Sequence, residues 1–64
     1  MNELSNLDEA INRASKCAVR ALKRNDDNSA FNSLKAVVHM YIRMRNYRKA
    51  SELIDTAKEI FPDF

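Results

Sequence analysis

Apolar residues recur at three- and four-residue intervals along three segments of the chain, which is the spacing of amphipathic helices. The most apolar segment lies at about 29–44, and on a helix its apolar positions cover an arc of roughly 160°. An ordinary surface helix needs a stripe of only about 100°. We therefore expect this segment to be the middle helix and to pack against two neighbours. Its apolar positions are Phe31, Leu34, Val37, Val38, Tyr41, Ile42 and Met44.

Two more helices are predicted on either side, at about 6–24 and about 47–61. The first is apolar at Leu4, Leu7, Ile11, Ala14, Ala18, Ala21 and Leu22. The third is apolar at Tyr47, Ala50, Leu53, Ile54, Ala57, Ile60 and Phe61. Little of the sequence alternates with a period of two, so no sheet is expected. Residues 1–64 are predicted to form one all-α domain, in which an N-terminal amphipathic helix packs on an antiparallel helix pair.

Polar residues mark the expected ends of these helices. The residues expected to cap the first and second helices are Ser5 or Asn6, and Asn28 or Ser29. Between the second and third helices, Asn46 is expected to take the left-handed conformation usual for glycine, which this chain lacks. Pro62 is expected to end the third helix, because the residue before a proline is biased away from the α conformation.

The length and composition bear on assembly and location. A chain of 64 residues buries only about 60% of its unfolded surface, so a lone monomer is marginal and a homodimer or another protein partner is expected. The single cysteine excludes an internal disulfide and indicates a reducing compartment. No apolar run approaches the ~20 residues of a membrane span, and the start MNELSNLDEA lacks a signal-peptide layout. We expect a cytoplasmic protein without membrane contact.

Candidate chemistry is sparse along the chain. Cys17 is expected to be a small packed side chain, since free cysteine is often buried. His39 is flanked on its helix face by Lys35 and Arg43, whose charges would repel a metal ion, and it has no second ligand one turn away. We therefore expect a solvated histidine. No metal, cofactor, small-molecule substrate or catalytic residue is predicted, so an enzyme is not expected.

The last 34 residues carry a further pattern of small and large apolar residues. The positions that form it are Leu34, Val37, Val38, Tyr41, Tyr47, Ala50, Ile54, Ala57 and Pro62. This pattern resembles one tetratricopeptide repeat, a 34-residue helix–turn–helix. It departs from the family at Val38, which is bulkier than the usual glycine or alanine, and at Arg45, which replaces the turn glycine. The resemblance implies a helical hairpin over residues 31–64 and protein binding, as in small bacterial secretion chaperones and regulators.

The three predicted helices carry more apolar surface than they can bury, and exposed apolar patches mark protein interfaces. We interpret the chain as a small non-catalytic protein–protein interaction module, such as a regulator, an anti-regulator or a secretion co-chaperone. Binding would be of the helix-in-groove kind, or between two copies. The apolar residues predicted to contact the partner are Leu4, Leu7, Ile11, Phe31, Ile42, Met44 and Phe64.

A basic stripe supports the alternative of a small nucleic-acid-binding transcriptional regulator. Basic residues gather on the polar face of the first helix and around the second turn, where they could contact phosphates or an acidic protein. They are Arg13, Lys16, Arg20, Lys23, Arg24, Arg43 and Arg45. The net charge of +2 does not by itself identify a nucleic-acid binder, and the same residues also fit an ordinary solvated face that suits the helix dipole.

Overall fold

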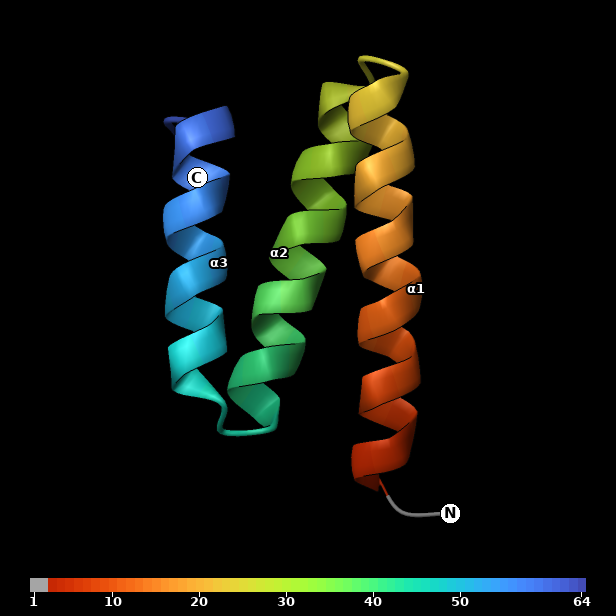
Figure 1. Cartoon of the computed structure of the whole chain (residues 1–64), viewed down its shortest axis with the longest axis vertical. Helices are drawn as coiled ribbons and strands as arrows, with labels where there is room; N and C mark the ends of the chain where they lie inside the picture. Colours follow the sequence, from red (N-terminus) through yellow and green to blue (C-terminus); the bar gives the residue numbers. More distant parts are fainter. Residues whose placement is uncertain (1–2) are drawn as a thin grey trace.

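The chain folds into three α-helices joined by two tight turns (Figure 1). The computed structural model describes the backbone of residues 3–64 and the side chains from residue 6 onward. Helix α1 spans Glu3–Lys23, α2 spans Asp27–Arg43 and α3 spans Tyr47–Ile60, and the described residues contain no strand. Helix α1 packs against α2, and α2 against α3. The predicted all-α, three-helix fold is confirmed.

The helices lie side by side in one layer with α2 in the middle (Figure 1). The Cα atoms span 36 × 20 × 12 Å, so the shortest dimension of the molecule is about a third of the longest. Within the described residues, α1 and α3 do not pack against each other. The fold is therefore an open layer, in which only the middle helix has two neighbours.

Both turns are built in the same way, and the structure corrects the residues predicted for them. Helices α1 and α2 each end in a Schellman motif: Asp26 N–H donates to Ala21 O at 2.8 Å, and Asn46 N–H donates to Tyr41 O at 2.9 Å. The left-handed residues are Asn25, with φ of 59°, and Arg45, with φ of 60°. Arg45 takes the conformation predicted for Asn46, because Asn46 is needed as the cap of the next helix.

The residue after each left-handed position caps the following helix. An Asp26 carboxylate oxygen accepts the backbone N–H of Ser29 at 3.3 Å, and the Asn46 side-chain oxygen accepts that of Lys49 at 3.3 Å. Asp26 thus takes the role predicted for Asn28 or Ser29. Helix α1 begins at Glu3 and not at Ser5 or Asn6. Helix α3 ends at Ile60, before Pro62, as predicted.

Alanine makes up half of the buried core formed by residues 6–64. The buried residues are Leu7, Ile11, Ala18, Ala21, Ala30, Leu34, Val37, Val38, Ala50 and Ala57. Ala18 and Ala21 bring α1 close to α2, and these two helices share the more extensive contact. Aromatic residues instead fill the space between α2 and the end of α3. Within the described chain, no helix has the combined length and apolarity that a membrane crossing requires.

Candidate protein-binding surface

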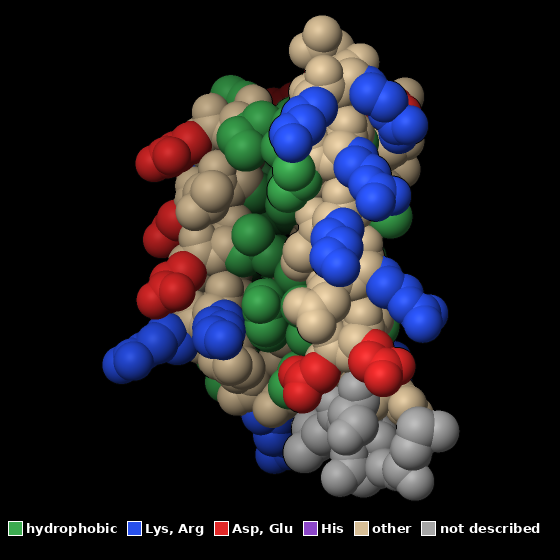
Figure 2. Space-filling model, turned by 45° about the vertical axis from the view of Figure 1, so that its right-hand side comes forward, with side chains coloured by type: hydrophobic (Ala, Val, Ile, Leu, Met, Phe, Trp, Pro, Cys, Tyr) green, Lys and Arg blue, Asp and Glu red, His purple; other side chains and the backbone are tan. Residues whose placement is uncertain are grey.

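A groove with an apolar floor runs along α2, between α1 and α3. A hollow of about 310 Å³ lies within this groove. The lining residues are Ser15 of α1, Val37 and Tyr41 of α2, and Lys49, Glu52, Leu53 and Thr56 of α3. Figure 2 shows this groove as a column of hydrophobic side chains between two helices that carry charged ones. The groove exists because α1 and α3 do not meet, so one side of α2 has no helix above it.

Two large apolar side chains remain exposed at the rims of this groove. Val19 of α1 is 51% exposed and lies in a depression that it shares with Ser15, a residue that also lines the groove. Ile60 of α3 is 45% exposed and follows Leu53 and Thr56 by seven and four residues, so it lies on the same side of the helix. The apolar surface thus continues from the floor of the groove to both of its walls.

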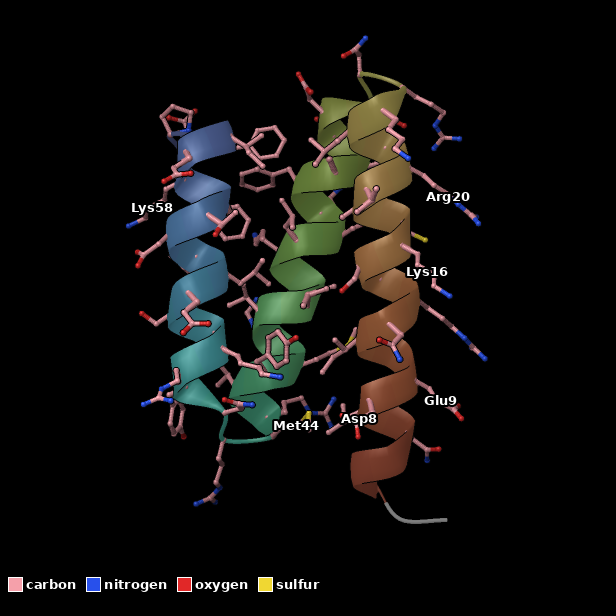
Figure 3. The ribbon with its side chains drawn as sticks, in the orientation of Figure 1. Asp8, Glu9, Lys16, Arg20, Met44 and Lys58 are labelled. Carbon is pink, nitrogen blue, oxygen red and sulfur yellow. The ribbon has the colours of Figure 1, made fainter. Side chains whose placement is uncertain are left out.

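The two walls carry opposite charges on their outer sides. Exposed bases follow α1 at Arg13, Lys16, Arg20 and Lys23, while exposed acids follow α3 at Glu52, Asp55 and Glu59. Figure 2 shows the acidic side chains of α3 to the left of the hydrophobic column and the basic side chains of α1 to its right. In Figure 3, Lys16 and Arg20 point away from α2. The groove therefore has an apolar floor, one basic border and one acidic border.

On the other side of the layer, aromatic residues join the start of α2 to the end of the chain. The Phe31 ring meets the rings of Phe61 and Phe64 edge-on, with centroid distances of 5.6 and 5.1 Å. A backbone hydrogen bond from Phe64 N–H to Phe61 O, at 2.8 Å, folds the last residues back. A pocket of about 350 Å³ lies beside these rings, lined in part by His39 and Lys58. The aromatic residues are already engaged within the chain.

The apolar residues predicted to bind a partner fall into three groups. Leu7 and Ile11 are buried under α2, so the expectation that they are exposed is wrong; α1 turns its large apolar start inward. Phe31, Met44 and Phe64 are half-buried, and Ile42 is 42% exposed. The side chain of Leu4 lies outside the described residues.

The predicted basic residues lie in separate places. The four on α1 form the exposed stripe described above. Arg24 lies at the turn before α2, whereas Arg43 and Arg45 lie at the turn after it. A 17-residue helix, about 25 Å long, separates the two turns. The structure therefore does not join Arg24 with Arg43 and Arg45 into one patch.

The remaining polar candidates have simple surroundings. Cys17 is exposed, contrary to the expectation of a packed thiol, because α1 is covered by only one neighbouring helix. His39 is exposed on α2, as predicted. The described residues contain no group of three or more His, Cys, Asp or Glu side chains placed to hold a metal ion. Sequence reasoning missed Val19 and the exposure of Ile60, although Val19 was recognisable as an apolar residue beside the basic stripe.

No match was found when the chain was compared with models of protein families, with curated proteins and with solved structures. The tetratricopeptide resemblance of residues 31–64 therefore stays a prediction. Helices α2 and α3 do form an antiparallel hairpin (Figure 1), with Ala50 and Ala57 buried. However, α2 packs more extensively against α1 than against α3, so the predicted pair is not the closest pair in the molecule.

Proposed function

We propose that the protein is a small non-catalytic protein–protein interaction module and that its groove is the binding surface. The observation that carries this proposal is the open side of α2. Apolar residues there lie between two helices that do not close over them. Domains are normally built from two or more packed layers around one core. This chain supplies one layer, so a second layer from a partner would complete the core.

The composition of the core supports the same proposal. Among the side chains that the structure describes, five of the ten buried apolar residues are alanines, and no large side chain is fully buried. Alanine removes little apolar area from water, and the stabilisation from burial is about 25 cal/mol per Å². Covering Val19, Tyr41, Leu53 and Ile60 with a partner would bury much larger side chains. Binding would therefore stabilise the partner and the fold of this chain together.

A photo-crosslinking experiment in the native cell tests this function. A benzophenone amino acid placed at Ile60 lies at the rim of the groove, whereas the matched control at Asn32 lies on the exposed polar face of α2. We expect protein adducts from position 60 and far fewer from position 32. The absence of adducts at position 60, or equal yields at both positions, would contradict the proposed binding surface.

The exposed basic stripe of α1 favours a second candidate function, a nucleic-acid-binding regulator. Phosphate contacts from Arg13, Lys16 and Arg20 would make binding fall steeply with salt. Reversing the charges of Arg13, Arg20 and Arg24 would then abolish binding to DNA or RNA in a gel-shift assay. If the parent protein gives no salt-sensitive shift, this candidate is eliminated.

A further inference from the structure

Helices α1 and α3 run in the same direction and at the same height on the two sides of α2. Ala18 of α1 and Ala57 of α3 belong to one buried cluster with Leu34 of α2, which fixes their relative height. In Figure 3, Arg20 and Lys58 also lie at about the same level of the long axis. A residue of α1 is therefore roughly level with the residue 39 positions later in α3.

At this offset of 39 residues the charges of the two helices are inverted. Glu9 corresponds to Arg48, Arg13 to Glu52, Lys16 to Asp55, and Arg20 to Glu59. All eight side chains are exposed. Four charged positions, spaced about one turn apart along one helix, thus lie level with the opposite charge on the other helix. Over the described residues, however, the two helices do not pack against each other.

The charges in the first turn of α3 do not suit the dipole of that helix. A helix dipole favours acids in the first turn and bases in the last, and α1 follows this rule with Arg20 and Lys23 in its last turn. Helix α3 has no acid in its first turn, where Arg48 and Lys49 lie, and its last turn holds Lys58 beside Glu59. The helix dipole alone therefore does not account for the positions of Arg48, Lys49 and Glu59 in α3.

We propose that the groove is covered by a second copy of this chain, related by a two-fold axis parallel to the helices. The inference rests on the proposed function and names its partner. Such an axis keeps every residue at its own height and places α1 of each copy over α3 of the other, so all four inverted positions meet. A two-fold axis across the helices would instead stack α1 on α1, with basic stripes together.

The size of the open face agrees with a pair of this kind. A face of 36 × 20 Å offers about 700 Å², close to the ~800 Å² that each partner buries in a standard interface. The apolar floors would form the centre of the interface, and the charged stripes its rim. In the alternative arrangement, copies pack side by side, with the basic stripe of one copy against the acidic stripe of the next. This arrangement would leave the groove of every copy open and would build an open chain of molecules.

Two charge-reversed variants test the proposal. One is Arg13→Glu, Lys16→Glu, Arg20→Glu, with two acidic helices; the other is Glu52→Lys, Asp55→Lys, Glu59→Lys, with two basic ones. For the parent, light scattering should give twice the 7.4 kDa of one chain. Each variant alone should dimerise roughly 100-fold more weakly, because like charges meet at both rims. Mixing the two variants should restore a dimer, since α1 of each then opposes α3 of the other with opposite charge.

The control variant Lys35→Glu, Arg45→Glu, Lys58→Glu changes the net charge as much as the first variant but leaves both stripes intact, and it should dimerise like the parent. Circular dichroism of every variant reports whether the helices persist. A variant that forms a dimer in the mixture, but not alone, must be folded. A monomeric parent at millimolar concentration, larger open assemblies, or a mixture that stays monomeric would overturn the proposal. Crosslinks from Ile60 only to a different protein would preserve the proposed function while overturning the second copy as partner.

Discussion

Leu34 is the residue through which the three helices share a core. It is buried between Ala18 and Ala57, and Leu53, Phe61 and Phe64 pack against the same cluster. The alanines on both sides bring the flanking helices close enough for one side chain to contact both. Small residues in the flanking helices thus make a single leucine of α2 central to the fold.

We expect Leu34→Ala to lower the free energy of unfolding by about 2–5 kcal/mol, because it leaves a cavity that the neighbouring alanines cannot fill. Urea unfolding followed by circular dichroism measures the change. Ile42→Ala is the control, because Ile42 is 42% exposed on the same helix and should change stability by no more than about 0.5 kcal/mol. Equal losses in the two variants would argue against the central role of Leu34.

Asp26 makes the stability of the turn before α2 depend on pH. The Ser29 side chain and then the Ser29 backbone N–H hydrogen-bond the carboxylate, which lowers the pKa of Asp26 below its ordinary value of 3.8. Because the folded pKa lies below the unfolded one, this contribution is present above about pH 4 and is lost as the pH falls through the folded pKa. We expect the melting temperature of Asp26→Asn to approach that of the parent as the pH falls from about 6 to about 2.

Asparagine at position 26 keeps an oxygen that can cap the helix, so the comparison isolates the charge. Asp27→Asn removes the same charge one residue later, from the first turn of α2 and not from its cap. A pH profile of Asp26→Asn that runs parallel to that of the parent would contradict the hydrogen-bond assignment.

At the scale of elements, the two turns show how this chain folds without glycine. Asn25 and Arg45 take the left-handed conformation, and the residue after each one caps the next helix. Asparagine tolerates this conformation better than arginine, because its short polar side chain can hydrogen-bond locally. The second turn therefore carries more backbone strain than the first.

Arg45→Gly should raise the free energy of unfolding by about 1 kcal/mol, because glycine removes the clash of the Cβ atom at positive φ. Asn25→Gly should gain less, and Arg45→Ala should gain nothing, since alanine keeps the Cβ atom. Thermal melts of the three variants at one protein concentration give the comparison. A stabilisation of the alanine variant equal to that of the glycine variant would point to the arginine charge and not to the backbone.

The helices and their order were predictable because the period of 3.6 residues is a local property. The residues that cap the helices were harder to predict. The side chains of several polar residues can cap a helix, and the local sequence does not show which one will do so. These candidates were Ser5, Asn6, Asn28 and Ser29. Asp26 and Asn46 became the caps because a Schellman motif places the next residue at the start of the following helix. The choice among similar polar residues thus depends on how one helix leads into the next.

At the scale of the whole molecule, association through the groove makes stability depend on concentration. If the folded chain is stabilised by pairing, mass action favours it at higher concentration. We expect the melting temperature to rise by several degrees between about 10 μM and about 1 mM protein. Differential scanning calorimetry measures this change in melting temperature. The two charge-reversed variants, each tested alone, should show a much smaller rise. A melting temperature independent of concentration in the parent would count against a dimer.

The sequence by itself determined three amphipathic helices, their faces, their order and the stop at Pro62, because spacing and turn chemistry act within a few residues. Only the tertiary structure decided that Leu7 and Ile11 turn inward, that α1 and α3 stay apart, and that Ala18 and Ala57 lie level across Leu34. These features depend on how closely whole helices approach, which the alanines of α1 and α3 allow and the aromatic rings at the end of α3 limit. The opposite charges of α1 and α3 can be paired only once the relative position of the two helices along their axes is known.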